Sequence, residues 1–113
     1  MHEMAITENL VKIVKEAAQQ NAVQQVHAVR VKIGRLRQVI PETLQFCFGV
    51  LARGTVAEQA SLEIEEIPVT VKCRTCNSES VIEEYVFLCP ACGGGDVQVV
   101  SGKELYVSTI ECD

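Results

Sequence analysis

Two pairs of cysteines constrain this 113-residue chain more than any other feature of its sequence. Cys73 and Cys76 form the first Cys-x-x-Cys pair, Cys89 and Cys92 form the second, and twelve residues separate the pairs. Cysteines three positions apart on a tight turn can direct both thiolates at one ion, and a second turn facing the first completes a tetrahedron. The spacing therefore predicts a closed, structural zinc site with the ligands Cys73, Cys76, Cys89 and Cys92.

The residues between and after the pairs suit this geometry. Asn77 and Gly93 both tolerate a positive φ, which lets each turn curl so that backbone N–H groups point at the sulfurs. Between the pairs, the apolar residues 81–82 and 85–88 are expected to form the two arms of a hairpin. Because this segment has few apolar side chains, we expect zinc binding to drive its folding, contributing on the order of 10 kcal/mol.

Two alternatives to structural zinc remain open from the sequence. A redox-active Cys-x-x-Cys normally opens a helix, and the run Cys-Pro-Ala-Cys-Gly-Gly-Gly is a poor helix start. The other alternative is a zinc-ribbon module that binds protein or nucleic acid. A net charge of -5, with acidic residues outnumbering basic ones over residues 69–102, disfavours nucleic acid. Of the remaining cysteines, Cys47 is expected in the core and Cys112 at the surface.

Hydrophobic periodicity outside the cysteine segment predicts two helices and three strands. Strands are expected at Val26–Ile33, around Leu62 and Ile64, and at Glu104–Ile110. A first helix is predicted over Met4–Gln20, and a second is expected to begin at Pro41 and to stop near Gly54. The apolar face of the first helix would consist of Ile6, Leu10, Ile13, Val14 and Ala17.

The predicted fold class is therefore α+β. Residues 1–68 and 103–113 are expected to form two helices packed on a three-stranded sheet. A zinc-ribbon-like four-cysteine module, residues 69–102, would be inserted before the last strand. No apolar stretch approaches the roughly 18 residues that span a bilayer, and the N-terminal segment does not resemble a signal peptide. We therefore expect a cytoplasmic protein without membrane association, in a compartment where thiols stay reduced.

The first three residues offer a second kind of metal site. The amine of Met1, the imidazole of His2 and the deprotonated backbone nitrogens of His2 and Glu3 can form a planar set of donors, which suits Ni(II) or Cu(II) better than zinc. Glu3 could instead contribute its carboxylate, or act only as a favourable acid in the first helical turn. Because a histidine near an N-terminus is a weak signal by itself, this site needs support from the rest of the chain.

Taken together, these residues resemble the hydrogenase maturation nickel metallochaperone family, HypA/HybF. The resemblance spans essentially the whole chain and includes Met1-His2-Glu3, Val31-Lys32-Ile33-Gly34, Leu44-Gln45-Phe46-Cys47-Phe48, Gly54-Thr55-Val56-Ala57 and the paired cysteines. It implies Ni(II) as cargo on the N-terminal residues, centred on His2, and structural Zn(II) on the four paired cysteines.

The resemblance also implies what the protein works with. Nickel would be delivered to the large subunit of [NiFe]-hydrogenase, in concert with a hydrogenase maturation GTPase. Neither nucleic acid nor membrane is expected as a partner, and a weak homodimer is left open. Since no serine–histidine–acid set or carboxylate pair stands out, we do not expect an enzyme.

Overall fold

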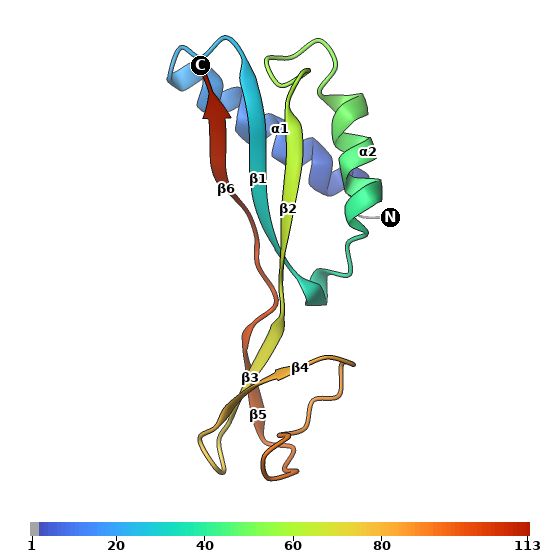
Figure 1. The fold of residues 1–113 in the computed structure, drawn as a ribbon, viewed down its shortest axis with the longest axis vertical. Coiled ribbons are helices and arrows are strands. Elements are labelled where there is room, and N and C mark those ends of the chain that lie inside the picture. Colours follow the sequence, from blue (N-terminus) through green and yellow to red (C-terminus); the bar gives the residue numbers. More distant parts are fainter. Residues whose placement is uncertain (1–2) are drawn as a thin grey trace. The chain divides into compact units, whose positions relative to one another are not determined.

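The computed structural model describes residues 3–113, which form two compact units. The first unit contains residues 3–32, 39–65 and 106–113, and the second contains residues 33–38 and 66–105. In chain order the elements (Figure 1) are α1 (Glu3–Gln20), β1 (Val26–Gly34), the 3-10 helix η1 (Arg35–Arg37), α2 (Pro41–Leu51), β2 (Ser61–Ile67), β3 (Val69–Cys73), β4 (Glu79–Ile82), β5 (Val97–Ser101) and β6 (Leu105–Cys112). Two helices and two three-stranded sheets confirm the predicted α+β class.

The first sheet has the strand order β2-β1-β6, so the last strand of the chain returns to pair with the first. α1 runs across one face of this sheet, as Figure 1 shows, and packs against α2. Along β1, Val29, Val31 and Ile33 are buried, while Arg30 and Lys32 are half-buried. This is the alternation that the sequence predicts for a strand with one face in the core.

Arg30 joins all three strands on the open face of the first sheet. Its guanidinium donates to Glu63 Oε1 on β2 at 3.1 Å, and to Glu111 Oε2 and Thr109 Oγ1 on β6 at 3.2 and 3.4 Å. The two carboxylates, Glu111 foremost and then Glu63, raise the pKa of Arg30. The cluster links the three strands at the sheet surface. Because these groups are exposed, their ion pairs contribute little to stability.

The buried face of α1 is rotated from the one that the sequence predicts. Leu10 and Val14 are buried as expected, but Ile13 is 46% exposed. The structure buries Thr7, Val11 and Ala18 instead. A threonine can occupy this face because its hydroxyl donates to the carbonyl of Glu3 at 2.7 Å, so that no polar group is left unpaired.

α2 begins where Pro41 fixes the backbone at the first helical position, and Ile40 before it is extended. Its buried side chains are Leu44, Cys47 and Phe48, so the prediction that Cys47 lies in the core is confirmed. The helix ends at Leu51, and Gly54 follows with a φ of +77°, a conformation that favours glycine.

The second sheet has the strand order β4-β3-β5, with β3 antiparallel to both neighbours. Its core is small: Val69, Val71 and Ile82 are buried, and the partly buried Leu36, Val97 and Val99 pack on them. The predicted hairpin is wrong, because residues 85–88 are not a strand and β4 pairs with β3 instead. Tyr85 has a φ of +56°, which interrupts the extended backbone that a second arm would need.

Residues 33–38 group with the second unit because the chain after β1 makes close contacts there. The N–H of Gly34 donates to the carbonyl of Glu104 at 2.7 Å, and the N–H of Leu36 donates to the carbonyl of Gly102 at 2.9 Å. The division of roles between the predicted segments 1–68 plus 103–113 and 69–102 stays a prediction. Between residues 3 and 113, no helix has both the length and the apolarity to cross a membrane.

We predict that Gly34→Ala destabilises the protein by about 1–3 kcal/mol, a range typical of overpacked sites. A Cβ at this position would lie 2.0 Å from the carbonyl carbon and oxygen of Gly102, which are backbone atoms that cannot rotate away. Gly49→Ala on the exposed side of α2 is the matched control, since nothing lies within 4 Å of its Cβ. Urea denaturation of both variants tests this, and equal stability of Gly34→Ala and wild type would contradict the close approach.

Candidate metal centre

The first cysteine pair sits on a tight turn between β3 and β4. The N–H of Asn77 donates to the carbonyl of Cys73 at 2.9 Å, and the N–H of Cys73 donates to the carbonyl of Ser78 at 2.9 Å. Asn77 has a φ of +63°, so the chain curls back directly after Cys76. We refer to residues 73–78 as the first cysteine turn.

Residues 89–94, the second cysteine turn, repeat the same bonding pattern. The N–H of Gly93 donates to the carbonyl of Cys89 at 2.7 Å, and the N–H of Cys89 donates to the carbonyl of Gly94 at 2.8 Å. Gly93 has a φ of +76° at the position that corresponds to Asn77. The prediction that Asn77 and Gly93 adopt positive φ is therefore confirmed, and two equivalent turns each present two sulfurs.

The four sulfur atoms converge. The Sγ atoms of Cys73, Cys76, Cys89 and Cys92 all lie within 4.8 Å of one another. The short contacts run between the two turns, with 3.7 Å from Cys73 to Cys92 and 3.6 Å from Cys76 to Cys89. Sulfurs placed about 2.3 Å from a central zinc ion in a tetrahedron are about 3.8 Å apart. The donor set and its spacing therefore fit zinc.

The same distances disfavour the thiol-disulfide alternative. The short sulfur–sulfur contacts cross from one Cys-x-x-Cys turn to the other, whereas a redox motif pairs the two cysteines of one turn.

Hydrogen bonds to the sulfurs favour thiolates at the buried positions of the centre. The N–H groups of Cys76 and Thr75 lower the pKa of Cys73. For Cys89, the Ser78 hydroxyl and the N–H of Cys92 lower the pKa to about 6. Backbone N–H groups thus point at the sulfurs, as the sequence predicts for such turns.

The pKa of Cys92 shifts in the opposite direction. The N–H of Gly94 favours its thiolate, but the neighbouring sulfurs of Cys73 and Cys89 outweigh that hydrogen bond and raise the pKa to about 11. Like charges this close disfavour full ionisation of the set. A divalent cation would remove that penalty and allow all four sulfurs to bind as thiolates.

Ser78 is a contributor that the sequence analysis missed. Its hydroxyl oxygen lies 3.0 Å from Cys76 Sγ and 3.4 Å from Cys89 Sγ, so it can donate to a ligand from either turn. Its position two residues after Cys76, at the end of the first cysteine turn, is the signal that could have identified it. Arg74 and Asp96 also brace the site, since the Arg74 guanidinium donates to Asp96 Oδ1 at 2.7 Å and the Arg74 N–H donates to the Asp96 carbonyl at 2.9 Å.

The other predicted metal ligands lie at the start of the chain. Met1 and His2 are outside the described residues. Glu3 begins α1 and is only 6% exposed. Its carboxylate accepts a hydrogen bond from the N–H of Ile40 at 3.2 Å, which ties the start of α1 to the start of α2. Cys112 is exposed, as predicted, and is not part of the four-sulfur cluster.

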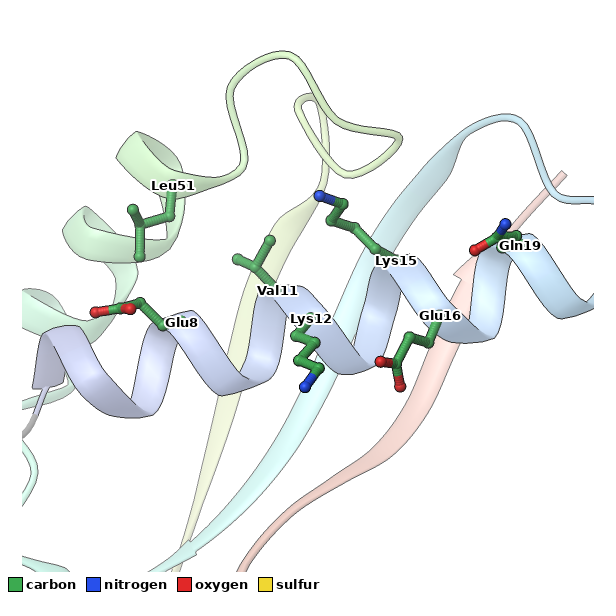
Figure 2. A pocket seen from close by; sticks show the side chains of 7 residues that line it. All are labelled: Glu8, Val11, Lys12, Lys15, Glu16, Gln19 and Leu51. Carbon is green, nitrogen blue, oxygen red and sulfur yellow. The ribbon is translucent and has the colours of Figure 1, made fainter.

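The first unit also carries a groove of about 460 Å³ beside α1. Val11 and Leu51 contribute apolar surface to it, and the other lining side chains are Glu8, Lys12, Lys15, Glu16 and Gln19. Figure 2 shows Glu8 directed toward Leu51 and the charged ends of Lys12 and Lys15 pointing away from each other. The groove contains neither histidine nor cysteine, and among residues 3–113 the four-cysteine cluster is the only group that meets the geometry of a metal site.

Comparison with known proteins gives consistent matches along the whole chain. A family model described as "Hydrogenase/urease nickel incorporation, metallochaperone, hypA" matches residues 1–112. The hydrogenase maturation factor HypA of Moorella thermoacetica is 39% identical over 111 residues, which cover 98% of each chain. HypA 2 of Bradyrhizobium diazoefficiens is 43% identical over 113 residues, which cover 100% of both chains.

Solved structures share the fold. The solution structure of the Ni metallochaperone HypA from Helicobacter pylori matches with a TM-score of 0.69 at 22% identity, covering 99% of this chain and 97% of that chain. A second solution structure of a HypA protein matches with a TM-score of 0.74 at 22% identity.

The family match and the full-length relatives agree with the resemblance drawn from the sequence. They define a class of metallochaperones for nickel incorporation, which are not enzymes. This chain therefore belongs to the HypA family of hydrogenase and urease nickel-incorporation metallochaperones.

Proposed function

We propose that this protein carries Ni(II) as cargo on its N-terminal residues, delivers it for [NiFe]-hydrogenase maturation, and uses Zn(II) on Cys73, Cys76, Cys89 and Cys92 as a structural ion. Membership of the nickel-incorporation family carries the proposal. The four-sulfur cluster supports its zinc half, because all four ligands come from the protein and no position remains for water or substrate.

The small core of the second unit supports a structural role for zinc. Three buried side chains, Val69, Val71 and Ile82, form that core, and a core of this size supplies little stability by itself. When bound, zinc contributes binding energy to folding. The chain's own groups hold the turns in place and orient N–H donors toward the sulfurs.

The nickel site is proposed on nitrogen donors. Met1 would contribute its amine, His2 its imidazole and its backbone nitrogen, and Glu3 its backbone nitrogen. Because α1 begins at Glu3, the N–H of that residue belongs to the first turn, where no intrahelical acceptor exists. Replacing its proton with a metal therefore breaks no helical hydrogen bond. The Glu3 carboxylate is buried and already accepts from Ile40, which makes it the less suitable donor.

The proposed partners follow from the same role. A hydrogenase maturation GTPase would act together with this protein, and the large subunit of [NiFe]-hydrogenase would receive the nickel, in the cytoplasm. Because nickel ligands compete with protons, the affinity of the N-terminal site should fall as the pH decreases. That competition provides a chemical route to release.

The zinc assignment predicts that Cys73→Ser loses zinc and unfolds the second unit. Cys73 is fully buried, and its removal leaves three ligands around the ion. The matched control is Cys112→Ser, an exposed cysteine outside the cluster, which should keep the zinc content of wild type. Metal analysis by mass spectrometry and amide exchange of residues 66–105 measure both effects. Unchanged zinc in Cys73→Ser would contradict the four-ligand site.

The nickel assignment predicts that His2→Ala abolishes nickel binding and leaves zinc content intact. The chain has two histidines, which provides a matched control: His27→Ala should bind nickel normally. His27 is exposed and its Nε2 lies 2.6 Å from Asp113 Oδ1 in the first sheet. Calorimetric nickel titration of untagged proteins tests the pair. Normal nickel binding by His2→Ala would overturn the N-terminal site.

Glu3→Gln distinguishes the two possible donors of this residue. Glutamine keeps the backbone nitrogen and an oxygen that can accept from the Ile40 N–H. If the backbone nitrogen binds nickel, as we propose, affinity should stay within about threefold of wild type, less than 1 kcal/mol. A loss of about a hundredfold or more, close to 3 kcal/mol, would assign the carboxylate as the ligand instead.

A further inference from the structure

The segment after β4 exposes large apolar side chains in sequence. Val86 is 54% exposed and Leu88 is 49% exposed, and Val81 on β4 is 51% exposed. Phe87 is exposed as well, at 39%. Isolated apolar residues at a surface are ordinary, but a contiguous group of this kind indicates a surface that is covered by something else.

Of these side chains, Val81, Val86 and Leu88 line a groove of about 480 Å³, which we call the β4 groove. Val81 and Ile82 of β4, together with Val86 and Leu88, provide its apolar lining, and the second cysteine turn lies against them. Figure 1 shows the chain leaving β4, looping away from the sheet and returning to the second cysteine turn. All residues that line the groove belong to the second unit, and the groove is open to the surface.

Specific contacts hold the wall of the groove in place. Tyr85 adopts a left-handed φ of +56°, and its hydroxyl donates to the carbonyl of Arg35 at 3.2 Å. That bond ties the start of the exposed segment to η1 within the second unit. At the other end, Leu88 precedes Cys89, whose N–H donates to the carbonyl of Gly94 at 2.8 Å. The groove is thus formed before any partner arrives, which lowers the entropic cost of binding.

Charge and backbone indicate what fits the β4 groove. Its two charged lining residues, Glu83 and Glu84, are both acidic. β4 pairs only with β3 among the strands of residues 3–113, so its second edge is available to an added strand. A segment that joins a free edge while placing alternate side chains into an adjacent pocket is a recurrent mode of peptide recognition.

We propose that the β4 groove binds an extended apolar segment of a partner protein, with lysine or arginine next to its apolar side chains. The apolar side chains fill the space beside Val86 and Leu88, and the basic ones pair with Glu83 and Glu84. This docking site is additional to nickel binding at the N-terminus. It depends on the structural ion, because the second cysteine turn forms part of the groove.

The test uses the full-length, zinc-loaded protein and a short fluorescein-labelled peptide in which leucine alternates with lysine. Fluorescence anisotropy should show binding that Val86→Ser/Leu88→Ser weakens by at least about tenfold, or 1.4 kcal/mol. Phe46→Ser is the matched control, since Phe46 is 72% exposed on α2, outside the groove, and its loss should leave peptide affinity unchanged.

A charge reversal keeps the test decisive if the apolar variant loses zinc. Glu83→Lys/Glu84→Lys changes only exposed side chains. Wild type should prefer the leucine–lysine peptide over a leucine–glutamate peptide, and this variant should reverse the preference. Nickel titration and zinc analysis of the same samples should be unchanged, which separates failure of the groove from failure of the metal assignments.

Three results would overturn the proposal. The first is no binding of the leucine–lysine peptide, or equal binding of both peptides to wild type. The second is loss of binding in Phe46→Ser, which would indicate general adhesion to apolar surface. The third is self-association in sedimentation experiments that Val86→Ser/Leu88→Ser abolishes, which would assign the groove to a second copy of this chain.

Discussion

The convergence of four cysteine sulfurs is the constraint on which the second unit depends. Four Sγ atoms within 4.8 Å of one another would repel as thiolates. The N–H of Gly94 favours the thiolate of Cys92, but hydrogen bonds with the neighbouring cysteine sulfurs, together with burial, outweigh it and raise the pKa of Cys92 to about 11. The two cysteine turns nevertheless direct backbone N–H groups and the Ser78 hydroxyl toward Cys73 and Cys89, which favours charge on those sulfurs. An arrangement that both gathers and stabilises thiolates is suited to a divalent cation. With a core built on Val69, Val71 and Ile82, the unit has little else to stabilise it.

The chemistry of the donors would account for the two metal sites that we propose in this short chain. Thiolates in a tetrahedron suit zinc, whereas nitrogens in a plane suit Ni(II). A closed site with four protein ligands retains its ion and serves folding. Nitrogen ligands such as an amine, an imidazole and backbone amides compete with protons, and so the proposed nickel site could release its ion to a recipient. In the described part of the chain, the four clustered cysteines belong to the second unit and Glu3 belongs to the first. Replacing one set of donors should therefore leave the other intact.

Sequence reasoning was most accurate where structure is local. The spacing of the cysteines, with Asn77 and Gly93 after them, determines the turns, because each depends on a few neighbouring residues. The alternation in β1 was predictable for the same reason. The predicted hairpin failed because strand pairing is set by the tertiary context of Val69, Val71 and Val99, not by the apolar run at 85–88. The buried face of α1 differs from the predicted one because the hydrogen bond of the Thr7 hydroxyl to the Glu3 carbonyl allows Thr7 to be buried. The contact between the Ser78 hydroxyl and Cys89 Sγ could not be predicted from the sequence, because Cys89 belongs to the opposite turn.

X-ray absorption at both metal edges, on untagged protein loaded with zinc and nickel, tests the central claim most directly. The account predicts a zinc edge with four sulfur neighbours at about 2.3 Å, and a nickel edge with nitrogen and oxygen neighbours only, in a planar arrangement. Sulfur in the first coordination sphere of nickel would contradict the separation of the two sites. A zinc edge with fewer than four sulfurs would contradict the closed, structural centre.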